Sequence, residues 1–235
     1  MTSVSTNLSK FSTCDVSDGL LNRNGDLYGG FFPNLQKWSG SSEHSVAGKA
    51  YTVLFAPCDD PREEVNYIDS VPPGSFIVIA LTVPLQLECA PYTRIPQALY
   101  GGLMSTRAQY QGACGSVVFG RVRDLEEHKA LGFPVFSYGL GSCAARMAVK
   151  PVGVNVPLQI LSHHDEFRTI NPGDYIVGDC HGIVRIPAAV DTEELTKYIE
   201  KSVEVDESIA GDVKDGKPLK ASQKERRAVL KKFTQ

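Results

Sequence analysis

The sequence predicts an α/β domain built on a mixed sheet, and three observations support that prediction. Runs rich in β-branched and aromatic residues alternate with helix-like segments between residues 46 and 190. Glycine- and proline-rich turns separate these runs, such as VPPG at 71–74 and NPGD at 171–174. The chain has 235 residues, of which 42% are hydrophobic and 22% charged, so one sizeable core is expected.

The expected elements follow from hydrophobic periodicity and from turn residues. In chain order they are a helix beginning near 15–19, strands at 46–55 and 76–83, a helix at 101–110 that opens on two glycines, a strand at 116–119, a helix at 124–131 closed by Gly132, and strands at 133–138, 151–157 and 175–186. The last strand run contains the turn sequence GDCHG at 178–182, which indicates a hairpin.

Residues 191–235 predict a charged helical C-terminal extension of the domain formed by residues 1–190. The extension carries ten acidic and ten basic residues. Asp191 and Thr192 are candidate caps, and Leu195, Ile199 and Val203 fall on one helical face. Such a face needs a partner surface, on the same domain or on a neighbouring subunit. We expect Gly211 and the DGKP sequence at 215–218 to end this helix, and a last short helix over 223–233.

Composition and charge exclude several classes of partner. The chain holds 24 basic and 27 acidic residues, for a formal net charge of −3, so we expect no nucleic-acid and no membrane partner. The N-terminus is too polar for a signal peptide, and the most apolar stretch, residues 76–87, is too short to span a bilayer. The six cysteines are scattered and show no C-x-x-C spacing. They predict buried, reduced thiols in a cytoplasmic protein.

Two sequence features imitate functional motifs. Gly139, Gly141 and Ala144 fit the G-x-G-x-x-G/A pattern of dinucleotide-binding loops and follow an expected strand. Pro151 leaves room for only about two helical turns after them, so a nucleotide-cofactor enzyme, such as a methyltransferase, is a weak hypothesis. The sequence His163-His164-Asp165 has no third metal ligand nearby in the chain and is typical of a surface turn.

A charged sequence follows the buried strand of residues 116–119. Arg123 and Asp124 stand at the carboxyl end of that strand, where open α/β sheets place their ligand sites. Asp124 and Glu127 also have the spacing of a capping box, with Asp124 at the N-cap of the next helix. From these residues alone, capping and ligand binding both remain open for Asp124.

The two glycines before the helix of residues 101–110 predict an anion site. At a helix that opens on Gly101 and Gly102, backbone N–H groups are uncovered and the helix dipole favours a negative ligand. A carboxylate or a phosphate fits such a position. The alternative is a tight loop that needs glycine for its geometry alone.

Together these segments resemble the RraA-like family, which includes the class II 4-hydroxy-4-methyl-2-oxoglutarate (HMG) aldolases. Twenty residues separate Gly102 from Arg123, and Asp124 and Glu127 complete the G-x20-R-D-x2-E/D signature of that family. The sequences DVSDGL at 15–20, LGFPVFSYG at 131–139, VNVPLQI at 154–160 and NPGDYIVGDCHGIVRIP at 171–187 are also similar to family segments. The long N-terminal segment and the polar tail resemble eukaryotic, fungal-like members.

The resemblance implies a compact, mixed-sheet α/β/β/α domain that assembles as a homotrimer with sites at subunit boundaries. It implies a small 2-oxo acid substrate, whose carboxylate is bound by the backbone amides of Gly101, Gly102, Leu103 and Met104. It assigns Arg123 to the substrate oxygen that gains charge and Asp124 to a divalent cation, Mg²⁺ or Mn²⁺. Glu127, one helical turn after Asp124, would reach that cation through water or cap the helix.

The sequence hypothesis is therefore a metal-dependent aldolase that cleaves HMG to two pyruvates and decarboxylates oxaloacetate. The family also holds inhibitors of an RNA-degrading enzyme, so a non-catalytic protein that modulates RNA turnover by protein contacts is the alternative. Because the fold is shared, fold alone does not decide between them. The presence of both Arg123 and Asp124 favours the enzyme.

Overall fold

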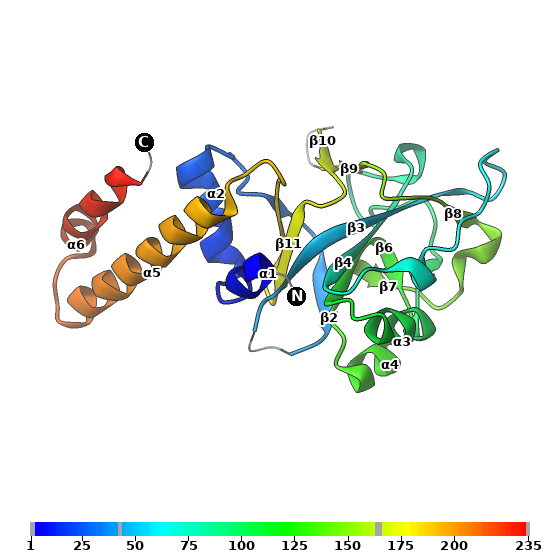
Figure 1. Cartoon of the computed structure of the whole chain (residues 1–235), viewed down its shortest axis with the longest axis horizontal. Helices are drawn as coiled ribbons and strands as arrows, with labels where there is room; N and C mark the ends of the chain where they lie inside the picture. Colours follow the sequence, from blue (N-terminus) through cyan, green and yellow to red (C-terminus); the bar gives the residue numbers. More distant parts are fainter. Residues whose placement is uncertain (1–2, 42–43, 163–165, 234–235) are drawn as a thin grey trace.

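Figure 1 shows the computed structural model of the chain, which describes residues 3–41, 44–162 and 166–233. The strands are β1 (Phe31–Phe32), β2 (Gln36–Ser39), β3 (Val46–Pro57), β4 (Ser75–Leu81), β5 (Ala98–Tyr100), β6 (Gly115–Val122), β7 (Val135–Leu140), β8 (Val149–Val154), β9 (Leu158–Leu161), β10 (Phe167–Ile170), β11 (Tyr175–Asp179) and β12 (Gly182–Ile186). The helices are α1 (Ser3–Leu8), α2 (Thr13–Asn24), α3 (Gly102–Tyr110), α4 (Leu125–Leu131), α5 (Thr192–Lys214) and α6 (Leu219–Arg226). Short 3₁₀ helices are η1 (Ile68–Ser70), η2 (Val83–Leu85), η3 (Ala145–Met147) and η4 (Arg227–Lys232).

One large mixed sheet organises the domain, which confirms the predicted α/β class. Ten strands belong to it, in the order β1-β12-β11-β3-β4-β6-β7-β2, with β5 added beside β6 and β8 beside β3. The pairs β3–β4, β4–β6, β5–β6 and β6–β7 are parallel, and the outer pairs are antiparallel. Strands β9 and β10 form a separate hairpin. The parallel centre matters for function, because the carboxyl ends of β5, β6 and β7 meet at one edge.

The sheet is covered on both faces, as its uniformly buried central strands require. All seven residues of β4 are buried. Alternate residues of this strand point to opposite faces, so Ile77 and Ile79 join the cluster that α3 and α4 cover. Phe76 and Val78 join the opposite cluster, which also contains residues of the β9–β10 hairpin. A third cluster packs α1, α2 and the start of α5 against β11 and β12.

The C-terminal tail is helical as predicted, but the first helix is longer than expected. Asp191 is its N-cap and accepts hydrogen bonds from the amides of Glu193 and Glu194. The helix runs through Gly211 and ends at Lys214, so the expected break at Gly211 is wrong. Gly211 is exposed, and an isolated exposed glycine lowers helix stability by only about 1 kcal/mol relative to alanine. Gly216, with φ of 90°, follows the end of the helix, so the expected break at the DGKP sequence of 215–218 is confirmed.

The far half of α5 leaves the sheet and packs on its own partners. Figure 1 shows α5 and α6 as an arm that points away from the strands. Leu195 and Ile199 lie in the cluster with α2, whereas Val205 and Ile209 pack with Leu230 of η4. The chain therefore has a fourth, small apolar cluster, which lies outside the sheet.

The cysteines differ from the prediction in burial but not in pairing. All six are free thiols. Five of them are exposed and Cys114 is half-buried, so the expectation of buried cysteines is wrong. Most of them stand in turns and segments that link the elements. In the described ranges, no helix is both long and apolar enough to cross a membrane.

Candidate active site

Two strand–turn–helix units bring the predicted site residues together. Strand β5 ends at Tyr100 and leads through Gly101 into α3, and β6 ends at Val122 and leads through Arg123 and Asp124 into α4. The strands are parallel neighbours, with Ala98 beside Arg121 and Tyr100 beside Val122. Their carboxyl ends therefore lie at the same edge. The amide of Arg123 also donates to the Tyr100 carbonyl over 3.0 Å, which fixes one turn against the other.

Asp124 occupies the N-cap position of α4 but does not cap that helix. Its backbone is left-handed, with φ of 61° and ψ of 44°, and its side chain makes no capping hydrogen bond. The carboxylate turns toward α3 instead, and Oδ2 accepts a hydrogen bond of 3.1 Å from the amide of Gly102. The same oxygen lies 3.5 Å from Nε of Arg123. The capping-box interpretation of Asp124 is therefore wrong, because its carboxylate bonds to α3 and not to the first turn of α4.

Gly101 and Gly102 are explained by side chains that pack closely against their backbone, and not by an unusual backbone conformation. A Cβ on Gly101 would lie 2.6 Å from Oδ2 of Asp124, and one on Gly102 would lie 1.8 Å from Oε2 of Glu127. Neither glycine has the positive φ that demands this residue type. Glycine is required here because the acidic side chains of the second unit pack directly onto the backbone of the first.

The start of α3 offers backbone donors to an anion. The amide of Met104 is satisfied by the carbonyl of Gly101 over 3.0 Å, and that of Gly102 by Asp124. The amide of Leu103 has no acceptor within the described part of the chain. It lies in the first turn of a nine-residue helix, where the helix dipole is positive. Among the amides of Gly102, Leu103 and Met104, the Leu103 amide is therefore the one that is free to bind a carboxylate.

These groups line a cleft of about 350 Å³. Its walls come from the β5–α3 turn, the β6–α4 turn, the loop before η1, and the segment from η3 to β8. The lining residues are Phe55, Glu64, Tyr67, Ala98, Leu99, Tyr100, Gly101, Leu103, Met104, Arg123, Asp124, Ala144, Ala145, Arg146, Val149, Lys150 and Pro151. The side chains of Arg123 and Asp124 are 38% and 31% exposed, so both reach solvent inside the cleft. A small polar ligand has access to both.

The floor beneath the charged pair is buried and neutral. Burial raises the pKa of Tyr100 to about 12, and the hydroxyl of Ser116 donates to its phenol oxygen over 3.0 Å. His128 is fully buried and stacks on Tyr100 with ring centroids 5.9 Å apart. Burial lowers the pKa of His128, although Asp124 and Glu127 act in the opposite direction. The charge at this edge of the sheet is therefore carried by Arg123 and the acidic residues, not by the floor.

Asp124 is the residue in the cleft that fits a divalent cation. One carboxylate oxygen is engaged by Gly102 and Arg123, and Oδ1 has no hydrogen-bond partner in the described ranges. A single free carboxylate oxygen beside open solvent fits Mg²⁺, which keeps most of its water ligands in proteins. Glu127 starts from the same helical turn and lies against Gly102. The carboxylates of Glu127 and Asp124 therefore both lie at the contact between α4 and the backbone of Gly102.

A second group of metal-binding side chain types lies far from this cleft along the chain, at the β11–β12 turn. Asp179, Cys180 and His181 place ligand atoms within 4.8 Å of one another. Both oxygens of Asp179, however, accept short hydrogen bonds of 2.7 Å from the amide and the hydroxyl of Thr13. The amide of His181 adds a third bond of 2.8 Å. These contacts join the β11–β12 hairpin to the start of α2, so a structural role accounts for Asp179.

The glycine motif at 139–144 does not open a helix. Gly139 belongs to β7, and the segment after it contains only the three-residue η3 before β8 begins. A dinucleotide site needs a helix whose N-terminus faces the pyrophosphate, so that hypothesis is wrong. The sequence His163-His164-Asp165 lies outside the described residues.

Three charged lining residues were missed by the sequence analysis. They are Glu64, Arg146 and Lys150. Arg146 and Lys150 follow the carboxyl end of β7, which is a parallel neighbour of β6. Their place in the cleft could have been predicted from that position, because a segment that leaves β7 must pass the same edge of the sheet as Arg123. Glu64 lies in an irregular loop and gave no such signal.

Comparison with known proteins places this chain in a family. The model of the RraA-like family, described as Aldolase/RraA, matches residues 13–185. The chain is 29% identical over 187 residues to Protein DlpA of Legionella pneumophila, covering 77% of this chain but only 27% of that protein. It is 31% identical over 159 residues to a Halalkalibacterium halodurans protein named "Putative 4-hydroxy-4-methyl-2-oxoglutarate aldolase", covering 68% of each.

The fold comparison agrees with the sequence comparison. A crystal structure of an uncharacterized protein from Pseudomonas syringae pv. tomato superposes with a TM-score of 0.78 at 26% identity. The alignment covers 95% of this chain and 93% of the other. The matched residues include both strand–turn–helix units, and the family motif falls where Gly102, Arg123, Asp124 and Glu127 meet in space. The chain therefore belongs to the RraA-like family.

Proposed function

We propose that this protein is a divalent-metal-dependent lyase that cleaves HMG to two molecules of pyruvate and also decarboxylates oxaloacetate. The observation that supports this most strongly is the meeting of Arg123, Asp124 and the first turn of α3 in one cleft. The bacterial relative that is named as an HMG aldolase gives independent support.

The 2-oxo acid end of the substrate fits between the two units. Its carboxylate would accept a hydrogen bond from the Leu103 amide, at the positive end of α3. The guanidinium of Arg123 would donate to the C2 oxygen, since its Nη groups remain available while Nε faces Asp124. Asp124 would hold Mg²⁺ or Mn²⁺ through Oδ1, with water filling the other positions. When bound, the cation supplies Lewis-acid polarisation of the C2 carbonyl.

The chemical step follows from this placement. In HMG the C4 hydroxyl loses its proton, the C3–C4 bond breaks, and its electron pair passes to C3 and the C2 oxygen. One pyruvate leaves with a new carbonyl at C4, and the remaining pyruvate enolate takes a proton at C3. Arg123 stabilises the charge that develops on the C2 oxygen, where a preorganised donor contributes about 2.7–4 kcal/mol.

Oxaloacetate needs the same stabilisation. Breaking its C3–C4 bond releases CO₂ and leaves the same pyruvate enolate, without removal of a hydroxyl proton. Arg123 and Asp124 would therefore serve both reactions, because both pass through a charged C2 oxygen. This common enolate is the reason that one cleft can support two activities.

We further propose that the chain assembles as a homotrimer with the cleft near a subunit boundary. Two large apolar side chains are left exposed in the single chain: Leu103 in the cleft lining is 74% exposed, and Met147, which lines an adjacent hollow, is 86% exposed. An apolar rim of this kind is typical of a surface that another subunit covers. Light scattering at micromolar concentration should give about three times the 25.5 kDa of one chain. A mass of one chain would contradict the assembly.

Pyruvate release from HMG tests the proposed function. With Mg²⁺ the protein should release two pyruvates per HMG, and a chelator should abolish the reaction until Mg²⁺ or Mn²⁺ is restored. Absence of pyruvate release under these conditions would favour the alternative, a non-catalytic protein that acts on RNA turnover by protein contacts. Release that a chelator leaves unchanged would remove the metal from the proposal.

A further inference from the structure

The closed end of the β11–β12 hairpin brings a thiol and an imidazole together beside a second thiol. Cys180 and His181 form the two-residue turn between Asp179 and Gly182, which pair across the hairpin. Cys14 is the second residue of α2. Both cysteines are exposed free thiols, and the side chain of His181 is 60% exposed. We call Cys14, Cys180 and His181 the hairpin–helix site.

One buried carboxylate fixes the two segments of this site to each other. The oxygens of Asp179 accept hydrogen bonds of 2.7 Å from the amide and the hydroxyl of Thr13, and one of 2.8 Å from the amide of His181. Cys14 directly follows Thr13, and Cys180 directly follows Asp179. The two thiols therefore start from hydrogen-bonded neighbours. Because the oxygens of Asp179 are engaged in these bonds, we do not count this residue as a ligand of the site.

The thiol and the imidazole of the turn have the spacing of two zinc ligands. Sγ of Cys180 lies 3.5 Å from Nδ1 of His181. Zinc binds cysteine sulfur at about 2.3 Å and histidine nitrogen at about 2.0 Å, so two such ligands at the tetrahedral angle lie about 3.5 Å apart. A thiol–imidazole hydrogen bond can have the same length, so the surroundings must decide between a proton and a metal ion.

The surroundings of the two thiols are negatively charged. Partial burial, together with the negative charges of Asp179, Asp15 and Asp18, raises the pKa of Cys14, and Cys180 acts in the same direction. Oxidation-prone cysteines lie in electropositive surroundings, so these thiols do not fit that class. A cation, in contrast, is attracted by the carboxylates and neutralises the thiolates that it binds. The charges therefore favour a metal ion at this position.

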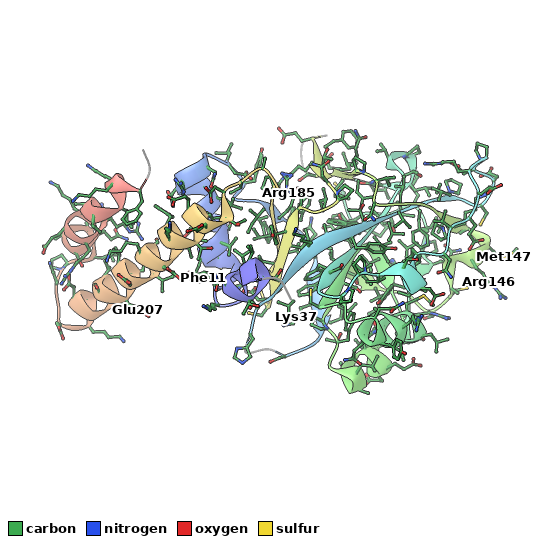
Figure 2. The ribbon with its side chains drawn as sticks, in the orientation of Figure 1. Phe11, Lys37, Arg146, Met147, Arg185 and Glu207 are labelled. Atoms are coloured by element: carbon green, nitrogen blue, oxygen red, sulfur yellow. The ribbon has the colours of Figure 1, made fainter. Side chains whose placement is uncertain are left out.

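The hairpin–helix site is separate from the candidate active site. Figure 2 shows Lys37 and Arg185 at opposite ends of the hairpin, and Arg146 of the cleft at the end of the molecule away from the α5–α6 arm. Lys37 marks the closed end, because its charge interacts with Asp179 and Cys180. Its ammonium donates to the carbonyl of Ser41. A ligand at the hairpin turn would therefore not enter the cleft.

We propose that Cys14, Cys180 and His181 bind one Zn²⁺ ion, with water in the fourth position. Cys180 and His181 keep their present spacing, and Cys14 completes the site when its exposed side chain turns about the Cα–Cβ bond. Both thiols release their protons to solvent, and no electron is transferred. The ion joins the start of α2 to the hairpin, next to the bonds between Thr13 and Asp179. Its role is to stabilise this junction, and it takes no part in pyruvate chemistry.

Titration of the full chain with Co²⁺, a spectroscopic probe of tetrahedral zinc sites, tests the proposal. A phosphine reductant keeps the thiols free, and excess Mg²⁺ competes for carboxylate sites such as Asp124. One equivalent of Co²⁺ should give the visible bands of tetrahedral cobalt and a thiolate-to-cobalt charge-transfer band in the near ultraviolet. Zn²⁺ should then displace the Co²⁺, because it binds N/S sites more tightly.

Substitution of each ligand should change this spectrum in a different way. Cys180→Ser and His181→Gln should lose the tetrahedral bands. Cys14→Ser should keep about half of the charge-transfer intensity, because one of two thiolates remains, and should bind Zn²⁺ at least about tenfold more weakly. The matched control is Cys89→Ser, which removes an exposed thiol of the segment between η2 and β5 and should leave the spectrum unchanged.

Thermal unfolding gives a second measurement. Zn²⁺ at about a hundredfold excess over Kd should raise the melting temperature by about 5–10 °C in wild type and Cys89→Ser, but not in Cys180→Ser. Without metal all variants should melt together, which shows that the exposed residues can be replaced without loss of the fold.

Three results would overturn the site. They are a Co²⁺ complex without a charge-transfer band, a spectrum that Cys180→Ser or Cys14→Ser leaves unchanged, and an equal loss of the spectrum in Cys89→Ser. Pyruvate release in Mg²⁺ should be the same in Cys180→Ser as in wild type. The zinc site and the proposed lyase activity can therefore fail independently.

Discussion

Asp124 shows how one backbone conformation assigns a role that the sequence leaves open. In a right-handed or extended conformation its carboxylate could cap α4. At φ of 61° the side chain leaves that helix and accepts a hydrogen bond from Gly102 on the neighbouring unit. A non-glycine residue in this region costs about 1–3 kcal/mol, so the rest of the structure must hold it there. The amide of Arg123, bonded to Tyr100, is one such restraint.

We expect Asp124→Asn to abolish metal-dependent pyruvate release while leaving the melting temperature within a few degrees of wild type. Asparagine tolerates the left-handed region and can still accept the Gly102 hydrogen bond, but it lacks the charge that a divalent cation requires. Asp191→Asn is the matched control, because Asp191 is a true N-cap and asparagine caps equally well. Near wild-type turnover in Asp124→Asn would exclude the metal role.

At the neighbouring position, we expect Arg123→Lys to lower kcat by about tenfold or more. Complete loss of a preorganised donor to a developing oxyanion costs about 2.7–4 kcal/mol, or about a hundredfold to a thousandfold, and the charge of lysine offsets part of that loss. Lysine keeps the positive charge but not the planar fork. Steady-state kinetics with HMG and with oxaloacetate should show the same loss. Full kcat with lysine at this position would mean that charge alone, and not geometry, supports the reaction.

At the scale of elements, the site depends on how closely two strand–turn–helix units pack. Glu127 of α4 lies against Gly102 of α3, so closely that a Cβ there would meet both Cβ and the carboxylate of Glu127. The carboxylate end is flexible, but Cβ of Glu127 moves only with the backbone of α4. Glycine at position 102 therefore sets the distance between the two helix starts.

We expect Gly102→Ala to separate α3 from α4 and to lower kcat/KM by about a hundredfold, because a displacement of about 1 Å at a catalytic group has an effect of that size. It should also lower the free energy of unfolding by about 1–3 kcal/mol, as overpacking does. Gly211→Ala is the matched control. No atom lies within 4 Å of its added Cβ, so it should raise the stability of α5 by up to about 1 kcal/mol and leave kcat/KM unchanged. Equal kinetics in the two variants would contradict the packing argument.

Helix α4 should also make stability depend on pH through His128. Burial lowers its pKa in the folded state, so below the ordinary histidine pKa the unfolded state binds more protons. This contribution is complete above about pH 6.5 and is lost as the pH falls through the folded-state pKa. The free energy of unfolding from urea titrations should therefore fall more steeply between pH 7 and pH 5 in wild type than in His128→Phe. Parallel pH profiles would show that His128 does not contribute.

At the scale of the whole molecule, much of the fold could be predicted because its central strands are long and apolar. Strands β3, β4 and β6 and helices α3 and α4 fall within a few residues of their expected positions. The short strands β1, β2, β5, β9 and β10 were not predicted. A strand of two to four residues carries too little periodicity to stand out, and its pairing is decided by the neighbouring strand.

The part of the candidate site that comes from the family motif could be predicted from the sequence. The part that a later segment of the chain contributes was missed. The meeting of Gly102 with Asp124 follows from two parallel neighbouring strands. Arg146 in η3 and Lys150 in β8 reach the same cleft just after a segment whose sequence imitates a nucleotide motif. The sequence could not decide whether Asp124 caps α4 or faces the cleft. That choice depends on the backbone φ of Asp124, which the sequence does not fix.

The central claim is that one cleft, containing Arg123 and Asp124, stabilises a pyruvate enolate for both aldol cleavage and decarboxylation. Oxalate resembles that enolate, so its inhibition of the two reactions in the same Mg²⁺-containing sample is the most direct measurement. A single competitive inhibition constant is expected for HMG and for oxaloacetate, and Asp124→Asn should lose both activities together. Two distinct constants, or an Asp124→Asn protein that keeps one activity, would contradict the account.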